Sequence, residues 1–304
     1  MAIRRDAVRV SVPASSANLG PMFDCAGLAL EIRDEYTAMA SDDEGVRVEV
    51  EGQGAEDVAR DESHLVVRAM HAMFAALGER PEGLVLHCRN VIPHGRGLGS
   101  SAAAIVGGMV LARAMVSDGR EHLTDADLLN VALEMESHPD NLSAALFGGC
   151  AIAWVDEDGR ADCLALTLHP QVQPLVFIPG SGLATSKARE MLDASVSRAD
   201  AVFNIARAGL LVHALTVDPG YLHAATKDRL HQDARADAYP ESISLLRQLR
   251  DADVPAVISG AGPSVLALGL VPAGLITTSS GAGWAIQRPA VAVHGAREIP
   301  IDPI

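Results

Sequence analysis

Three glycines at alternate positions, followed by two serines and a run of alanines, form the stretch of this sequence best suited to chemistry. It extends from Pro93 to Ala104 and reads Pro-His-Gly-Arg-Gly-Leu-Gly-Ser-Ser-Ala-Ala-Ala. Glycine has no Cβ, so the backbone can turn sharply and approach a ligand closely. Ser100 and Ser101 are common N-cap residues, which predicts a helix from about Ala102 whose free N–H groups face the glycines. Such a helix start attracts anions, and we expect it to bind phosphate groups.

The spacing separates this loop from two better-known nucleotide-binding patterns. It lacks the GxxxxGK spacing of a P-loop, and its three glycines do not form the GxGxxG of a dinucleotide site. A flexible turn before a helix is the plain alternative. Residues 102–115 follow directly and include Gly107 and Gly108, small residues that favour a tightly packed, buried helix over a linker.

A second cluster of polar side chains occupies residues 134–141, which read Glu-Met-Glu-Ser-His-Pro-Asp-Asn. A solvated helix end would explain the two glutamates. It does not explain the Asp-Asn pair, because the apolar residues 142–149 follow directly and predict partial burial. The cluster is therefore a candidate site for a metal ion or a polar substrate.

Four further polar residues allow either a structural or a functional interpretation. Asn18 and Asp24 lie in a proline-bounded loop, where both residue types commonly form turns. Arg189 and Arg235 fit solvated surface positions equally well, and an arginine can also hold a carboxylate with two parallel hydrogen bonds.

Periodic patterns predict the elements that must position these residues. Pro13 is expected to end the first strand, Ser63 to cap a helix that ends at Gly78, and Thr124 to begin another with a capping box. Strands are expected at residues 8–12, 46–50, 83–88, 148–155, 175–178, 256–259 and 265–268. The other helices are expected at residues 102–115, 124–133, 199–215 and 240–252, with one more beginning near Thr185.

Composition limits the class of protein. With 304 residues, of which 49% are hydrophobic and 21% charged, the chain is long enough for two globular domains. The formal net charge of −15 disfavours nucleic acid and anionic membranes as partners. The 4 cysteines are scattered without a CxxC pair, so we expect a reducing cytoplasm and no zinc site. The N-terminal residues do not resemble a signal peptide, and the longest uncharged run is too short to span a bilayer.

Four segments, in order along nearly the whole chain, resemble the GHMP kinases and among them the homoserine kinases. Residues 93–104 resemble the second GHMP motif, PxxxGLGSSAA. Residues 13–24 resemble PATSANLGPGFD, with Met22 in place of the usual glycine. Residues 136–149 resemble EGHPDNxxxALFGG with Ser137 in place of glycine, and residues 260–268 resemble GAGPSVLAL.

The resemblance implies an α+β GHMP kinase fold with two domains. Residues 1–157 would form the nucleotide-binding domain, which is ribosomal S5 domain 2-like with a left-handed βαβ unit. Residues 158–304 would form a ferredoxin-like domain. Members of the family are often homodimers, so we expect a homodimer here.

The implied reaction is transfer of the γ-phosphoryl group of MgATP to the side-chain hydroxyl of L-homoserine, a step of threonine biosynthesis. ATP would contact Pro93, Gly95, Arg96, Gly97, Leu98, Gly99, Ser100, Ser101, Ala102, Ala103 and Thr185. The amino acid would contact Asn18, Asp24, His138, Asp140, Arg189 and Arg235. Asn141 would lie near the attacking hydroxyl, while Glu134 and Ser101 would hold Mg²⁺, with Glu136 as the alternative carboxylate.

Two other functions compete with this one. A GHMP kinase for another small alcohol, such as mevalonate, would keep the glycine loop but have no need of the two arginines. A catalytically inactive relative would have no need of the metal carboxylate. Because an amide cannot accept a proton at neutral pH, Asn141 is not expected to act as a general base.

Overall fold

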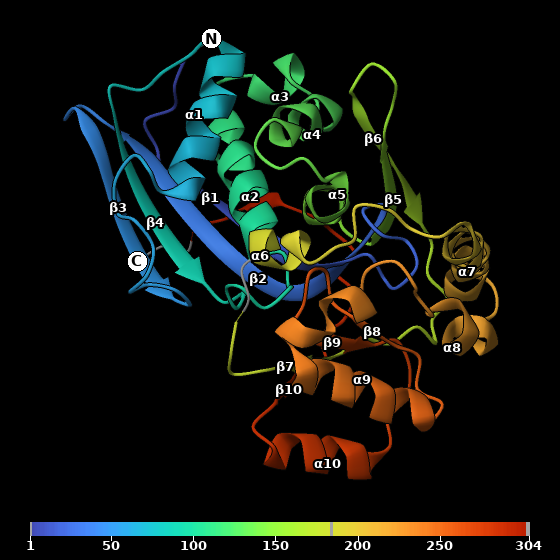
Figure 1. Ribbon diagram of the computed structural model, residues 1–304. Coiled ribbons are helices and arrows are strands. Elements are labelled where there is room, and N and C mark those ends of the chain that lie inside the picture. Colours follow the sequence, from blue (N-terminus) through green and yellow to red (C-terminus); the bar gives the residue numbers. More distant parts are fainter. Residues whose placement is uncertain (1, 183–184, 302–304) are drawn as a thin grey trace.

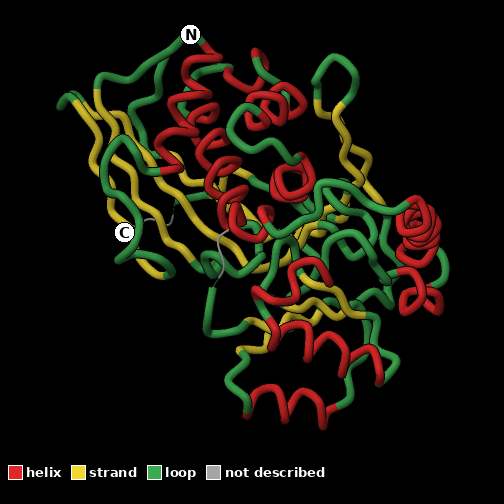
Figure 2. The backbone as a smooth tube through the Cα atoms, viewed as in Figure 1, coloured by secondary structure: helices red, strands yellow, loops and turns green. Residues whose placement is uncertain are grey.

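The computed structural model describes residues 2–182 and 185–301. For residues 185 and 186 it describes the backbone alone. Two sheets form the framework (Figures 1 and 2). One has seven strands and contains the order β11-β1-β2-β4-β3, with β5 pairing to β2 and β6 to β5. The other has four strands in the order β10-β7-β9-β8. The polar clusters identified in the sequence lie where these two units meet.

The larger sheet carries a layer of helices on one face (Figure 1). Its strands are β1 (Val8–Ala17), β2 (Ala26–Ser41), β3 (Gly45–Gly52), β4 (Gly83–Asn90), β5 (Cys150–Val155), β6 (Ala161–Leu166) and β11 (Arg297–Ile299). The helices are α1 (Leu65–Leu77), α2 (Ser100–Ala114), α3 (Gly119–His122), α4 (Asp125–Leu133) and α5 (Pro139–Phe147). β3 and β4 are parallel and are joined by α1, which gives the expected βαβ unit.

Helix α2 lies at the centre of this domain, and its small residues explain why. A Cβ on Gly107 would lie 2.4 Å from the ring of Tyr36, and one on Gly108 would lie 2.6 Å from the carbonyl oxygen of Val66 in α1. Only glycine permits such close approach, so the predicted tight packing of this helix is confirmed.

The smaller sheet has the strand order of a ferredoxin-like domain. Numbered within the sheet, β7 (Leu175–Ile178), β8 (Ala256–Ile258), β9 (Val265–Ala267) and β10 (Ala285–Gln287) lie side by side in the order 4-1-3-2. Helices α6 (Thr185–Glu190), α7 (Arg198–Thr216), α8 (Leu222–Ala225) and α9 (Pro240–Asp251) connect β7 to β8, and α10 (Ala273–Gly281) connects β9 to β10. The apolar face of α9, including Ile243 and Leu249, packs into the core of this domain.

The chain passes between the two sheets at positions that differ from the expected domain boundary between residues 157 and 158. That division would separate β5 from β6, although the two strands form an antiparallel hairpin. The change of sheet occurs between Leu166 and Leu175, and β11 then returns to pair with β1. We therefore propose domain limits that follow the sheets, with the C-terminal strand counted in the first domain.

Two local predictions were wrong, each for a physical reason. Pro13 does not end β1, because a register shift between Pro13 and Ala14 lets the strand continue to Ala17 despite the missing N–H. Ser63 does not cap α1; its hydroxyl instead donates to Asp61, 2.6 Å away. The capping box at Thr124 and the left-handed C-cap at Gly78 are confirmed.

Candidate active site

The glycine loop joins β4 to α2 and owes its shape to left-handed backbone angles. Gly95, Gly97 and Gly99 have φ angles of 63°, 71° and 69°. A Cβ on Gly97 would lie 2.2 Å from the carbonyl oxygen of Ser259, so the loop rests on the turn between β8 and β9. The third motif therefore packs under the glycine loop. A side chain at Gly97 would disturb the fold as well as any bound ligand.

Helix α2 begins two residues earlier than the sequence predicted. Gly99 is its N-cap residue, so Ser100 and Ser101 lie in the first turn and do not cap the helix. The backbone N–H groups of a first turn have no partner within the helix. Those of Ser100, Ser101 and Ala102 belong to residues that line a cleft at this helix end, which is the arrangement that binds phosphate groups.

The other residues expected to bind the nucleotide divide into two groups. Gly95, Gly97, Leu98 and Gly99 line the same cleft. The guanidinium of Arg96 turns away and donates to the carbonyl oxygens of His94, Pro179 and Gly180. Among the described residues, Pro93 and Ala103 are not part of the cleft lining, and the side chain of Thr185 lies outside the described residues.

A cavity of about 280 Å³ adjoins the cleft at Ser100 and Ser101. Its walls come from α1, from the segment before α1 and from the end of β4, and include Val58, His64 and Asn90. The His64 ring is buried, and its Nδ1 has no hydrogen-bond partner among the described residues. The sequence analysis did not identify this cavity, because a histidine before a helix and a valine in a connection carry no motif.

Asp140 and Asn141 form the first turn of α5 and project into the cleft from the larger domain. Asp140 is only 2% exposed, and burial raises the pKa of its carboxyl to about 7, with the charge of Asp24 adding to the effect. One carboxylate oxygen accepts the backbone N–H of Asn141 at 2.6 Å. Asn141 in turn accepts a 2.8 Å hydrogen bond from the hydroxyl of Ser15 in β1, which fixes the amide in the cleft.

The structure distinguishes between the two glutamates of this segment. Glu136 lines the cleft, whereas Glu134 is the C-cap residue of α4 and is not part of the cleft lining among the described residues. The carboxylate of Glu136 lies 2.8 Å from Nδ1 of His138, and this hydrogen bond holds the pKa of the histidine above its usual value. The geometry thus favours Glu136, the alternative carboxylate for a metal ion.

The loop between β1 and β2 is strained and is tied to both domains. Asn18, Leu19 and Asp24 all have positive φ angles, of 71°, 45° and 56°, a conformation that costs free energy in residues other than glycine. The Asn18 side chain accepts the backbone N–H of Asp24 and donates to the carbonyl oxygen of Gly260, both at 2.9 Å. Asn18 lines the cleft, but its amide is used to shape the loop.

Both arginines reach the cleft from the smaller domain. Arg189 in α6 donates to Asp24 at 2.8 Å. Arg235 is only 2% exposed; its Nε donates to the carbonyl oxygen of Ala188 at 2.9 Å and its Nη1 lies 3.2 Å from Nδ1 of His231. Its Nη2 has no hydrogen-bond partner within the described part of the chain.

Two rings whose role no sequence pattern indicates, those of Phe23 and His231, position these arginines. The guanidinium carbons of Arg189 and Arg235 each lie 5.5 Å from the ring centre of Phe23, and Phe23 stacks on His231. Burial lowers the pKa of His231 and keeps the ring neutral, with Nε2 donating to the carbonyl oxygen of Gly20 at 2.8 Å. Nδ1 is then the acceptor for Arg235.

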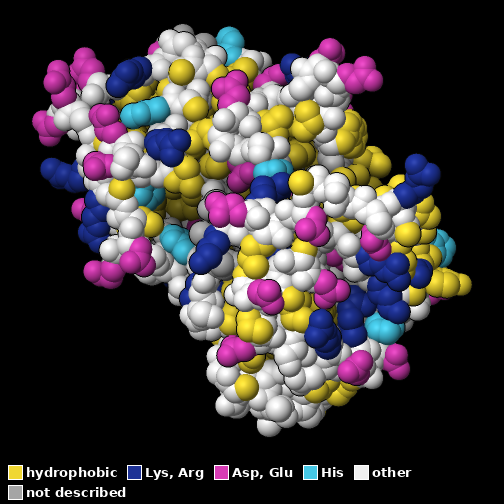
Figure 3. All heavy atoms as spheres, in the orientation of Figure 1, with side chains coloured by type: hydrophobic (Ala, Val, Ile, Leu, Met, Phe, Trp, Pro, Cys, Tyr) yellow, Lys and Arg dark blue, Asp and Glu magenta, His cyan; other side chains and the backbone are white. Residues whose placement is uncertain are grey.

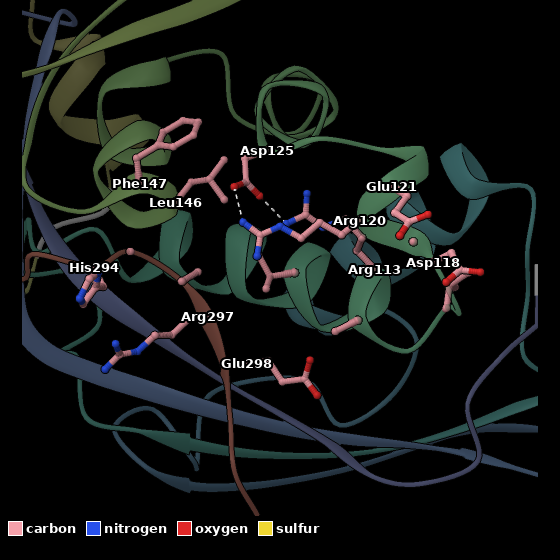
Figure 4. A pocket seen from close by; sticks show the side chains of 16 residues that line it. Arg113, Asp118, Arg120, Glu121, Asp125, Leu146, Phe147, His294, Arg297 and Glu298 are labelled. Atoms are coloured by element: carbon pink, nitrogen blue, oxygen red, sulfur yellow. Dashed lines mark hydrogen bonds and ion pairs between the residues drawn. The ribbon is translucent and has the colours of Figure 1, made fainter.

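A roomier cavity, of about 560 Å³, lies elsewhere, between α2, α3 and the segment around residues 294–298. In Figure 4 the carboxylate of Asp125 faces Arg113 and Arg120, and it pairs with both. The glycine loop takes no part in its lining. Because both arginines are already paired with Asp125 and the glycine loop lies elsewhere, the smaller cleft at the domain junction is the better candidate active site.

Comparison with known proteins agrees with this choice. Residues 64–149 match the model of the GHMP kinases N terminal domain. The chain is 47% identical to a homoserine kinase of Streptomyces coelicolor, covering 99% of this chain and 97% of that protein. It is 50% identical to a homoserine kinase of Mycolicibacterium paratuberculosis over 84% of this chain and 82% of that one. The chain belongs to the homoserine kinases of the GHMP family.

Solved structures of a homoserine kinase and of another enzyme show the same fold. A homoserine kinase from Cytophaga hutchinsonii aligns with a TM-score of 0.86 at 25% identity, covering 98% of this chain and 99% of that one. The mevalonate diphosphate decarboxylase from Enterococcus faecalis aligns with a TM-score of 0.63 at 13% identity, covering 97% of this chain and 99% of that one. Within the described residues, no helix is long and apolar enough to cross a membrane.

Proposed function

We propose that the cleft binds L-homoserine and ATP and catalyses phosphorylation of the side-chain hydroxyl to O-phospho-L-homoserine, a step of threonine biosynthesis. GHMP kinases are ATP-dependent phosphotransferases, and the glycine loop at the start of α2 supplies the phosphate-binding element. One observation carries the choice of substrate. Among the described residues, the same cleft contains a carboxylate without a cationic partner and an arginine with an unused N–H group.

The unpaired carboxylate is Asp140. The other cleft carboxylates already have partners, since Asp24 pairs with Arg189 and Glu136 with His138. A buried carboxylate without a cation is costly, and an ammonium group bound beside it would remove that cost. We therefore assign the α-ammonium group of homoserine to Asp140, and the α-carboxylate to Arg235 with help from Arg189.

The nucleotide would extend from the glycine loop into the cavity beside it. Its phosphates would meet the N–H groups of Ser100, Ser101 and Ala102. Its base would enter the cavity beside His64, where the unpartnered Nδ1 and an apolar wall suit a purine. The two cavities share Ser100 and Ser101, so base, phosphates and amino acid would lie in sequence along one continuous site.

A magnesium ion is implied by the family, and the donor set in the cleft fits one. Magnesium is usually bound by one or two carboxylates together with phosphate oxygens and water. Glu136 and Ser101 line the cleft beside the glycine loop and would hold the ion. The bound metal would neutralise charge on the phosphates during transfer.

Positioning and electrostatics would account for the remaining catalysis. Asn141, fixed by Ser15, would orient the attacking hydroxyl, because its amide can donate a hydrogen bond but cannot take a proton. The N–H groups of α2 would stabilise charge that develops on the transferred group. The proton would leave late, to phosphate or solvent.

A substrate comparison tests the proposal. The purified enzyme should phosphorylate L-homoserine with ATP and turn over 4-hydroxybutyrate, which lacks the amino group, at least about a hundredfold less efficiently, because Asp140 would stay unpaired. Mevalonate should not be a substrate. Equal kcat/KM for homoserine and 4-hydroxybutyrate would refute the amino-acid site and favour a kinase of another small alcohol. A cytoplasmic location and a homodimer stay predictions.

A further inference from the structure

A second charged cavity, of about 390 Å³, lies between α7, α9 and the segment that leads to Arg235. Five basic side chains line it: Arg207, Lys227, Arg229, Arg247 and Arg250. Figure 3 shows Lys and Arg side chains gathered on this part of the surface. The whole chain carries a formal net charge of −15, so a positive cavity here is a local feature that composition does not explain.

The two carboxylates in the cavity wall, Asp228 and Asp233, offset only part of this charge. Asp228 is fully buried and accepts hydrogen bonds from the backbone N–H groups of residues 230–232 and from the side chain of Asn204. Asp233 lies 3.6 Å from Arg247 in an exposed pair, and such pairs contribute little. In the described residues Lys227 has no ion-pair partner.

The guanidinium groups are held in place before any ligand binds. The guanidinium carbons of Arg229 and Arg207 lie 4.0 and 4.8 Å from the ring centre of Phe203, within cation–π distance. Arg250 donates to the carbonyl oxygens of His223 and Thr226. Burial lowers the pKa of Arg250 to about 10, which still leaves it charged at neutral pH.

One buried donor in this cavity lacks an acceptor. The Nε of Arg207 is buried and has no hydrogen-bond partner in the described part of the chain. An unsatisfied buried donor costs free energy, and more so when the group is charged. An oxyanion in the cavity would supply that acceptor and would face several guanidinium groups at once.

We propose that this cavity binds a small phosphate-bearing anion. A phosphate dianion offers several acceptor oxygens in different directions and so suits guanidinium groups that come from separate elements. The volume is that of a site for a small molecule. No described residue lines both this cavity and the cleft at the glycine loop, so the two sites are separate.

Titration with inorganic phosphate tests the site. Isothermal calorimetry at constant ionic strength compares the wild-type chain with the double variant Lys227→Gln/Arg247→Gln, and thermal unfolding is followed in parallel. Both side chains are exposed, so the variant should fold normally. Arg288→Gln, which removes an exposed arginine elsewhere in the same domain, is the matched control.

We expect the double variant to bind phosphate about tenfold more weakly, which is a loss of about 1.4 kcal/mol in binding free energy. The control should bind phosphate as tightly as wild type. The stabilisation against thermal unfolding that phosphate gives should also be smaller in the double variant than in wild type. Unchanged affinity in the double variant would overturn the proposal, because phosphate would then bind only at the glycine loop. O-phospho-L-serine distinguishes the source: tighter binding than phosphate indicates an organic phosphate ester, and equal binding indicates inorganic phosphate.

Discussion

The two ends of the cleft are built in different ways. The phosphate end is one uninterrupted stretch of chain, from Gly95 to Ala102, in which three glycines and a helix start provide backbone N–H groups. The amino-acid end brings together Asp24, Asp140, Arg189 and Arg235, which lie far apart in the sequence and come from both domains. The first end depends on local conformation, and the second depends on how the two domains pack.

This difference determines how each end responds to substitution. In the proposed site, backbone groups would bind the phosphates, so a side-chain change there should act mainly through the metal ligand or through backbone strain. Buried charges would bind the amino acid, so removing one should leave another without a partner. The following predictions test this contrast, from the largest expected effect to the smallest.

At the phosphate end, Glu136→Gln should lower kcat about 10²–10³-fold, because the metal would lose its carboxylate. The KM for homoserine should change little. Steady-state kinetics against magnesium concentration is the measurement. Glu134→Gln is the matched control and should stay within about threefold of wild type, since this side chain does not line the cleft. The reverse pattern would return the metal to Glu134.

At the amino-acid end, Arg235→Met should raise the KM for homoserine by about 2–4 kcal/mol in binding free energy, because the arginine is buried and its partner carboxylate would be left desolvated. The affinity for ATP measured without homoserine should not change. Circular dichroism must show that the variant is folded, since Arg235 also bonds to α6. Equal loss of affinity for both ligands would contradict the assignment.

Asp140→Asn should weaken homoserine binding about 10–100-fold and at the same time stabilise the free enzyme. The folded pKa of Asp140 is about 7, above its unfolded value, so ionisation of this group opposes folding as pH rises through the window from about 4 to about 7. The excess stability of the variant should therefore be small near pH 4 and reach a few kcal/mol above pH 7. Thermal unfolding across this range measures it. A constant difference would show that Asp140 does not carry the shifted pKa.

Ser15→Ala should have the smallest effect, lowering kcat up to about tenfold, because it removes one hydrogen bond to Asn141 worth about 0.5–1.5 kcal/mol. The KM for ATP should be unchanged. Rapid-quench measurement of the phosphoryl-transfer step distinguishes this effect from slower product release. A wild-type rate in Ser15→Ala would mean that Asn141 is oriented by other contacts.

The same contrast between local and long-range structure explains which parts of the site could be predicted from the sequence. The glycine loop, the Asp-Asn pair and the two arginines were identified because each belongs to a short pattern or a residue type suited to its ligand. His64, Phe23 and His231 were missed, because a buried ring gains its role from neighbours that no local pattern specifies. The sequence could not show which of Glu134 and Glu136 faces the cleft. The two residues lie two positions apart at a helix end, and side chains with that spacing point in different directions.

The sequence by itself determined the order of the motifs, the residue types proposed to meet the ligands and the elements with strong periodicity, because backbone conformation there depends on nearby residues. Tertiary structure decided which charges are paired. Asp24 and Asp140 are the same residue type, yet one meets Arg189 while the other is buried with no cation from the described part of the chain. It also decided that Gly97 must be glycine, because the carbonyl of Ser259 lies against it. Burial and charge pairing act through space between segments more than a hundred residues apart, and only the packed chain sets those distances.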